Sequence, residues 1–264
     1  KRKPWACQTG AAHATGDWLL FLDADTRLEN DAMDRIAALT RQPDRVFSIC
    51  PYHTVRRPYE QLSAFFNVIM LAGANAFGVQ REPGRDAALF GQCLLISTAL
   101  YRRIGGHETV RGEVLENFRL ARHLEAMGIP RDCYLGRGVV TMRMFPCGFG
   151  DLWSGWKKGF AGGAKHTAPR ALALSSVWLT GAMLACVGIA LAPFASPGFQ
   201  AAAAAVYLLY AAQCRWAFRL AGNFSWPNAL LFPFALLFYQ SLFFAAIAGR
   251  KLGVKTRWKG RHVD

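Results

Sequence analysis

Trp18-Leu19-Leu20-Phe21-Leu22-Asp23-Ala24-Asp25 is the stretch that decides the fold. Five apolar residues without a break predict a strand buried on both faces, as in a parallel sheet. Two aspartates, one residue apart, follow at the carboxyl end of this strand, where open α/β sheets bind their ligands. We therefore expect an α/β domain with a ligand site at Asp23 and Asp25.

Other elements of an α/β domain are predicted on the carboxyl side of this stretch. They are a helix capped by Asn30, a strand over residues 46–50, a largely apolar helix over 59–77, a strand over 89–96 and a helix over 113–127.

The spacing of Asp23 and Asp25 suits a divalent cation. Mg²⁺ and Mn²⁺ take oxygen ligands and usually share them with substrate phosphates. A turn with two solvated aspartates is the alternative. Glu113 and Glu116 lie in the first turn of a predicted helix, where negative charge is favourable for the helix itself. Either could instead be a general base, which must be separate from the metal ligands.

Aromatic and basic residues alternate just before the apolar part of the chain. Trp153, Trp156, Lys157 and Lys158 could supply an aromatic platform for a sugar and cations for a diphosphate. The same composition is typical of the belt beside a membrane helix. The sequence leaves both interpretations open.

The composition is both apolar and basic. Hydrophobic residues make up 53% of the 264 residues, and the formal net charge is +14. The apolar segments are too long for a soluble nucleic-acid-binding protein, so we expect a membrane partner and no nucleic acid. Seven cysteines without CxxC spacing are expected to be reduced thiols.

We expect three regions: a catalytic domain over 1–168, a membrane region over 169–249, and a basic cytoplasmic tail over 250–264. Residues 172–195 and 227–248 are uncharged and long enough to span a bilayer, whereas 201–214 is shorter. A cytoplasmic catalytic domain and a cytoplasmic tail require an even number of spans. We therefore expect two spans and one interfacial or re-entrant piece in a multi-pass protein of the cytoplasmic (inner) membrane. Segment 201–214 could span, with Arg215 and Arg219 at an interface, or it could lie in the interface.

Several short motifs resemble glycosyltransferase family 2 and, within it, the 4,4'-diaponeurosporenoate glycosyltransferase group of carotenoid biosynthesis. The motifs that carry the resemblance are Lys3-Pro4-Trp5-Ala6-Cys7-Gln8, Phe21-Leu22-Asp23-Ala24-Asp25, Pro51-Tyr52-His53, Tyr59-Glu60, Phe65-Phe66-Asn67, Phe90-Gly91, Gly105-Gly106-His107, Glu116, Gly148-Phe149, Gly155-Trp156-x-Lys158 and Trp258-Lys259-Gly260-Arg261. Their order and spacing extend over nearly the whole chain.

The resemblance implies a GT-A fold and an inverting mechanism. Asp25 matches the metal-binding aspartate, and Asp23 matches its partner near the nucleotide. Lys3, Asp23, Trp156 and Lys158 are expected to contact the nucleotide sugar, and Glu116 matches the catalytic base. The family usually has Glu-Asp at the base, whereas Asn117 follows Glu116 here.

The resemblance also implies the reaction. Processive members carry Gln-x-x-Arg-Trp, and this chain lacks that motif, which favours transfer of a single sugar from a UDP-sugar to a lipid-soluble acceptor such as a carotenoid acid. The family's first strand, with a uracil-reading aspartate, has no counterpart, so we expect an N-terminally truncated chain that binds nucleotide poorly on its own. The alternatives are an inactive membrane scaffold and a transferase for a hydroxylated lipid or hopanoid.

Overall fold

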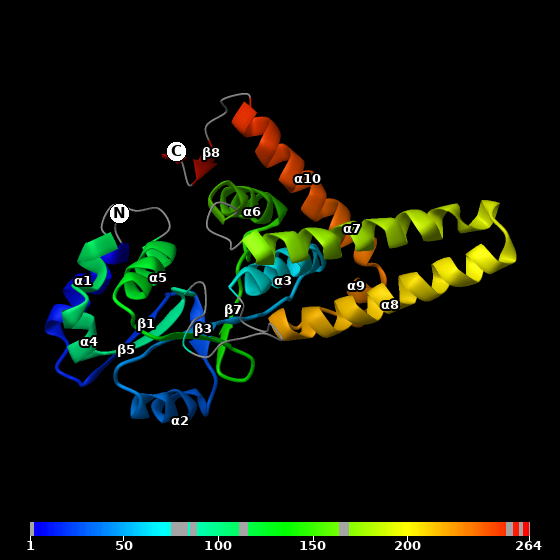
Figure 1. Cartoon of the computed structure of the whole chain (residues 1–264). Helices are drawn as coiled ribbons and strands as arrows, with labels where there is room; N and C mark the ends of the chain where they lie inside the picture. Colours follow the sequence, from blue (N-terminus) through cyan, green and yellow to red (C-terminus); the bar gives the residue numbers. More distant parts are fainter. Residues whose placement is uncertain are drawn as a thin grey trace. The chain divides into compact units, whose positions relative to one another are not determined.

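The computed structural model contains two compact units (Figure 1). One consists of Lys1–Tyr52 and Leu71–Arg143, and the other of His53–Met70 and Met144–Asp264. The units therefore divide the chain at other places than the predicted boundary at residue 168. The structure describes residues 3–74, 84, 89–110, 116–163, 169–251, 256–258 and 261–263.

A mixed four-stranded sheet forms the centre of the first unit. Its order is β1 (Trp18–Leu22), β5 (Cys93–Ser97), β3 (Val46–Cys50), β6 (Arg131–Leu135). β5 is antiparallel to both of its neighbours, and β3 is parallel to β6. Strand β1 thus points in the same direction as β3, with β5 between them.

The predicted strand over Trp18–Leu22 is confirmed, but its predicted surroundings are wrong. It pairs with β5 in antiparallel register, and among the described residues it has no partner strand on its other edge. Only Leu19 is buried, and Leu22 is exposed. An open groove of about 450 Å³ runs between β1 and helix α1 (Lys3–His13). The continuous apolar run is therefore an edge strand, and helix α1 covers only part of it.

The two inner strands, in contrast, are buried on both faces. Successive residues of a strand point to opposite faces. Val46, Leu94 and Ile96 pack on one side, and Phe47 and Leu95 pack on the other. The core of the first unit therefore has a layer on each face of the sheet.

Helices and short strands complete the first unit. They are β2 (Thr26–Leu28), α2 (Ala32–Ala37), η1 (Ala38–Arg41), α4 (Thr98–Arg103), η3 (Gly106–Val110), α5 (Glu116–Ala126) and β7 (Val140–Met142). Strand β4 (Tyr52–His53), where the chain passes into the second unit, is third in the sheet β2-β7-β4.

Several predicted boundaries need correction. Strand β5 begins at Cys93, because residues 89–92 lead into it without strand structure. The N-cap of α2 is Asp31 instead of Asn30, and it makes no side-chain capping bond. The predicted helix over 59–77 is a 3-10 helix, η2 (Pro58–Ser63), followed by α3 (Ala64–Gly73). Pro58 suits the first turn of such a helix because its missing N–H has no helical partner there.

Helices dominate the second unit. After η2 and most of α3 come α6 (Phe149–Gly163), α7 (Pro169–Leu191), η5 (Ala192–Phe194), α8 (Pro197–Ala221), α9 (Trp226–Leu230), α10 (Phe232–Lys251), β8 (Thr256–Trp258) and β9 (Arg261–Val263). Two stretches, Pro169–Phe194 and Phe232–Gly249, are long and apolar enough to cross a membrane. The predicted middle segment, 201–214, is in fact part of the 25-residue helix α8, because Ser196 caps it and Pro197 starts it well before the alanine run.

Candidate functional site

Asp23 occupies a tightly held turn at the end of β1. Its N–H donates to the Gln92 carbonyl at 2.9 Å, which continues the β1–β5 ladder by one residue. Its own carbonyl accepts from both the backbone N–H and the hydroxyl of Thr26, at 3.0 and 2.6 Å. The backbone of the acidic loop is therefore fixed, and the direction of the Asp23 side chain is fixed with it.

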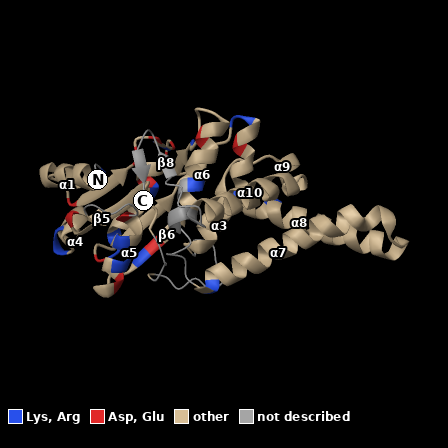
Figure 2. Cartoon of the chain, turned by 90° about the horizontal axis from the view of Figure 1, so that it is seen from above, with Lys and Arg blue, Asp and Glu red and all other residues tan. Residues whose placement is uncertain are grey.

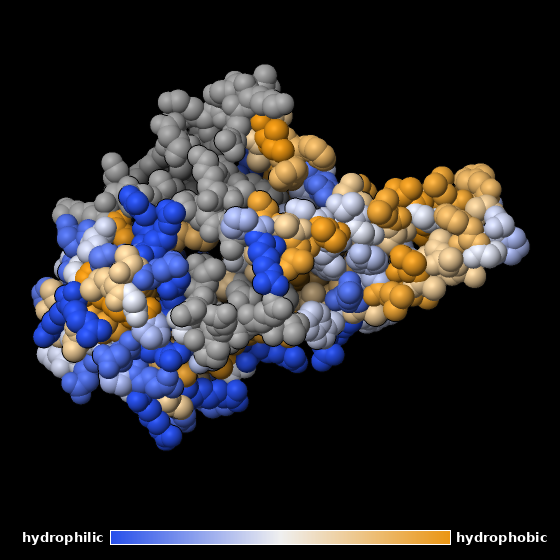
Figure 3. Space-filling model, in the orientation of Figure 1, coloured by the Kyte–Doolittle hydropathy of each residue, from blue (hydrophilic) through white to orange (hydrophobic). Residues whose placement is uncertain are grey.

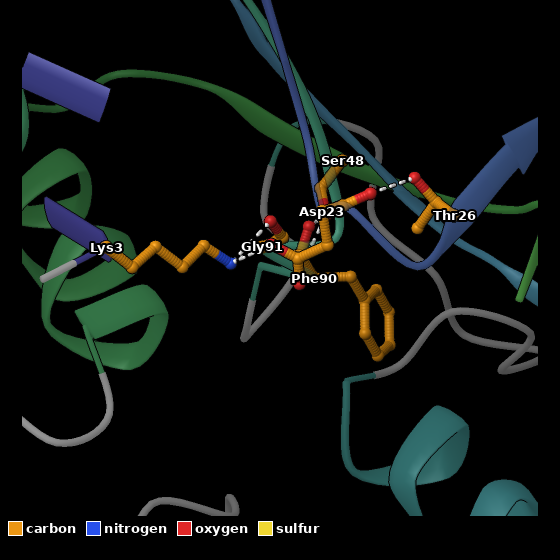
Figure 4. A network of polar contacts seen from close by, with 6 residues as sticks. All are labelled: Lys3, Asp23, Thr26, Ser48, Phe90 and Gly91. Atoms are coloured by element: carbon orange, nitrogen blue, oxygen red, sulfur yellow. Dashed lines mark hydrogen bonds and ion pairs between the residues drawn. The ribbon is translucent and has the colours of Figure 1, made fainter. Parts of the chain in front are cut away.

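Lys3 of α1 is the cation of this site. Its ammonium forms an ion pair with Asp23 Oδ1 at 2.5 Å and donates to the Gly91 carbonyl at 3.1 Å (Figure 4). The two side chains are about one-third exposed, at 36% and 28%. Substrate could therefore reach both groups, and each is also tied to the protein.

The side chain of Ser48 in β3 contacts the segment that contains Gly91. The Ser48 hydroxyl accepts from the Phe90 N–H at 2.5 Å and lies 3.0 Å from the Phe90 carbonyl (Figure 4). Gly91 also has no room for a side chain, since a Cβ atom there would collide with the amide of Asn117. Lys3, Asp23, Ser48 and the beginning of α5 thus meet around one short segment.

Glu116 is the first residue of α5 and is half-buried. Its position relative to the acidic loop can be judged from Cys7. The pKa of the Cys7 thiol is raised chiefly by burial, is lowered by Lys3, and is raised by the negative charges of Asp23 and Glu116. One thiol is therefore within electrostatic reach of all three predicted site residues. Glu113, the other candidate base, lies outside the described residues.

Asp25 is exposed in the same turn. Within the part of the chain that the structure describes, no group of three or more His, Cys, Asp or Glu side chains could enclose a metal ion. Mg²⁺ is commonly held by one or two carboxylates together with substrate phosphates. Asp23 and Asp25 fit this open kind of site, and they do not fit a cage made of protein alone.

A second polar cluster lies behind the site, and the sequence analysis gave it no role. The Tyr101 hydroxyl is 2.9 Å from both Gln8 Oε1 and His107 Nδ1, and it accepts from the His107 N–H at 3.0 Å. The His107 ring meets Phe21 of β1 edge-on at 4.8 Å. Burial, with a smaller contribution from Lys3, lowers the pKa of His107 from 6.5 to about 4. His107 is therefore neutral at physiological pH and supports β1 and α1.

Trp156 lies in the second unit. It is buried, its indole N–H donates to Ser63 Oγ at 3.0 Å, and its ring stacks on Phe66 at 4.6 Å. These contacts are those of a core residue, and contact with a sugar stays a prediction. The side chain of Lys158 lies outside the described residues.

Comparison with known proteins identifies the family. The model of glycosyl transferase family 21 matches residues 2–264. The chain belongs to glycosyl transferase family 21. The sequence analysis predicted the coarser class, a glycosyltransferase, and this is confirmed, whereas the matching model describes family 21 and not family 2.

The curated relatives of this family 21 chain that are described below share one name. A 4,4'-diaponeurosporenoate glycosyltransferase of Staphylococcus haemolyticus is 34% identical over 195 residues, which is 73% of the chain and 52% of that relative. One of Staphylococcus aureus (strain MRSA252) is 30% identical over 99% of the chain and 71% of the relative. The matched part of the chain thus spans about half the length of the first relative. The predicted resemblance to this group is confirmed.

Proposed function

We propose that the protein transfers a single sugar from a nucleotide sugar to a lipid-soluble acceptor at a membrane surface, with inversion at the anomeric carbon. The observation that carries the proposal is the meeting of Lys3, Asp23 and the start of α5 at Gly91, in a chain of family 21. The names of the relatives support a carotenoid acid as acceptor. We propose UDP as the nucleotide.

In this mechanism the acidic loop holds the donor. Asp25, with Asp23 beside it, would hold Mg²⁺ or Mn²⁺ together with the diphosphate of the substrate. The bound cation would neutralise charge on the departing diphosphate. Lys3 lies 2.5 Å from Asp23, so its ammonium is placed to approach the same phosphates. In the second unit, Trp156 and Lys158 stay candidates for contact with the donor.

Glu116 is proposed as the general base. It would take the proton of the acceptor while the acceptor oxygen attacks C1 of the sugar and the C1–O bond to the diphosphate breaks. An acceptor carboxylate is already ionised at neutral pH and has no proton to lose. Glu116 would then mainly orient the acceptor, and only a hydroxyl acceptor would need it as a base.

The test uses the full-length protein in membranes, UDP-[14C]glucose with Mn²⁺, and 4,4'-diaponeurosporenoate as acceptor. Because binding and charge stabilisation at the diphosphate are lost, Asp25→Asn is expected to lower transfer by roughly 10²-fold or more. With a hydroxylated lipid as acceptor, Glu116→Gln is expected to lower transfer by roughly 10²–10⁴-fold, and with the carboxylate acceptor by much less.

Two exposed acidic residues outside the site provide matched controls, Asp34→Asn and Glu29→Gln. Both variants are expected to keep the parent activity. Normal transfer by Asp25→Asn would contradict the role of the acidic loop. If the parent protein transfers sugar from none of a panel of nucleotide sugars, the proposed function is wrong.

A further inference from the structure

Helices α7 and α8 form one long hairpin in the second unit (Figure 1). They are joined side by side: Trp178 Nε1 donates to Gln213 Oε1 at 3.0 Å, and Gly188 faces Ala203. Residues 171–214 contain no Asp, Glu, Lys, Arg or His. Arg170 is the second residue of α7 and Arg215 lies in the last two turns of α8, so both flank this stretch at the end of the hairpin away from the turn between the helices. The far part of the hairpin is drawn without charged residues (Figure 2).

The outer surface of the hairpin is largely apolar (Figure 3). Its most exposed large side chains include Leu174, Val177, Leu184, Leu208 and Leu209, each between 58% and 70% exposed. Within residues 171–214 the buried side chains of α7 and α8 are small: Ala182, Ala185, Ala203, Ala211 and Cys214. The large buried side chain of α8, Phe218, lies beyond this stretch. This pattern is typical of helices that pack together in lipid and is opposite to that of a soluble hairpin.

Length agrees with the same surroundings. Helices of 23 and 25 residues extend about 34–38 Å at 1.5 Å per residue, and the hydrocarbon core of a bilayer is about 30 Å thick. Each helix is therefore long enough to cross a bilayer, although of the two only α7 belongs to a stretch that is also apolar enough by composition.

The end of α8 is tied to a segment that precedes every long apolar helix. The Asn223 side chain accepts from the Val55 N–H at 2.5 Å and donates to the Val55 carbonyl at 3.2 Å. Further on, the Ser225 N–H and the Asn228 amide donate to Gln61, at 3.1 and 3.2 Å. Residues 54–61 follow directly on β4 and come before the long apolar helices of the described part of the chain. The end of α8 must therefore lie on the same face as residues 54–61.

Helix α10 is also packed against elements that come before the hairpin. The Phe238 ring lies 5.8 Å from that of Phe66, 5.7 Å from Phe149 and 5.9 Å from Trp153. These contacts are with α3 and α6, and α6 also contacts η2. Helix α10 also contacts the middle of the hairpin, because Gln240 donates to Met183 Sδ of α7 at 3.3 Å and the Phe232 ring lies 5.0 Å from that of Tyr207 of α8. It is long and apolar enough to cross a membrane.

We infer that α7 and α8 enter a phospholipid bilayer together as a hairpin, with both ends on the face that carries residues 54–61. The middle segment, 201–214, which the sequence allowed either to span or to lie in the interface, then lies in the bilayer beside α7.

Cysteine labelling tests the position of the end of α8. Trp226 is 65% exposed just after Asn223, and the exposed Cys147 precedes α6. We would place Trp226→Cys in a Cys147→Ser background and compare it with the parent, which keeps Cys147. A membrane-impermeant maleimide is expected to label both proteins in inside-out vesicles and neither in right-side-out vesicles. Labelling of Trp226→Cys only from the opposite face, or from neither face, overturns the inference.

A second measurement tests entry into lipid. The double variant Leu184→Lys, Leu209→Lys places two charges on the outer surface of the hairpin. The matched control, Met33→Lys, Met127→Lys, changes two exposed side chains of the first unit. The hairpin variant is expected to lose severalfold in the membrane fraction that resists carbonate extraction, while the control is retained. Equal retention of the two proteins contradicts insertion of the hairpin.

Discussion

At the scale of single residues, some residues of the site could be predicted from the sequence alone and others could not. Asp23, Asp25 and Glu116 stand out because carboxylates after a strand or at a helix start are a recognisable pattern. Lys3 entered only through the resemblance, and its ion pair with Asp23 could not be predicted because the two residues are 20 positions apart. Gly91 and Asn117 could not be paired from the sequence, since their contact depends on how α5 packs.

His107 gives a prediction for pH dependence. Its pKa is about 4 in the folded protein and 6.5 as the ordinary value. Between these pH values the unfolded chain binds a proton that the folded chain excludes, so stability falls as the pH falls through this window. The loss at pH 4 is on the order of 3 kcal/mol, at 1.36 kcal/mol per pKa unit.

His107→Asn should reduce this dependence, because an amide can reach the Tyr101 hydroxyl as Nδ1 does but does not titrate. The measurement is the melting temperature in detergent at pH 7.5 and pH 5. The difference between the melting temperatures at these two pH values should be smaller for His107→Asn than for the parent. His13→Asn, which changes an exposed histidine of α1, should leave the difference unchanged. A His107→Asn variant with the parent's full difference would show that another group dominates.

At the scale of elements, the sequence predicted where strands and helices occur better than it predicted which elements lie beside them. Strands β1 and β3 occur at their predicted residues, because a short and largely apolar run bounded by turn-forming residues is typical of a buried strand. The edge position of β1 and the antiparallel β5 depend on the order of strands, which periodicity does not contain. The full length of α8 was missed because the prediction followed hydropathy, whereas the helix is set by the Ser196 cap and Pro197.

The contact between α7 and α8 yields a prediction with a control in the same helix. A Cβ at Gly181 would collide with the Tyr210 hydroxyl, whereas a Cβ at Gly188 would lie 3.9 Å from Ala203, an ordinary contact. Gly181→Ala is therefore expected to lower the free energy of unfolding by about 1–3 kcal/mol, as overpacking does. Gly188→Ala should be neutral or slightly stabilising, since alanine is the better helix former. Thermal unfolding in detergent measures both, and equal melting temperatures would contradict this packing.

At the scale of the whole molecule, composition predicted a membrane partner but could not place the helices. The charge of +14 and the apolar segments are visible in the sequence. The direction in which α8 returns is decided by Asn223 and Val55, which are 168 residues apart. No local sequence pattern predicts a hydrogen bond between residues so far apart in the chain.

The ion pair between Lys3 and Asp23 has a consequence for how the protein discriminates between ions. An anionic loop that already carries its own counter-ion gains little from a free divalent cation, because the newcomer must displace an ammonium held at 2.5 Å. A cation that arrives together with a diphosphate offers the ammonium a new anion in exchange. Under the proposed function, the loop would therefore bind the metal together with the diphosphate of the donor and would bind it poorly alone. Calorimetric titration with the metal alone should then release or absorb almost no heat of binding.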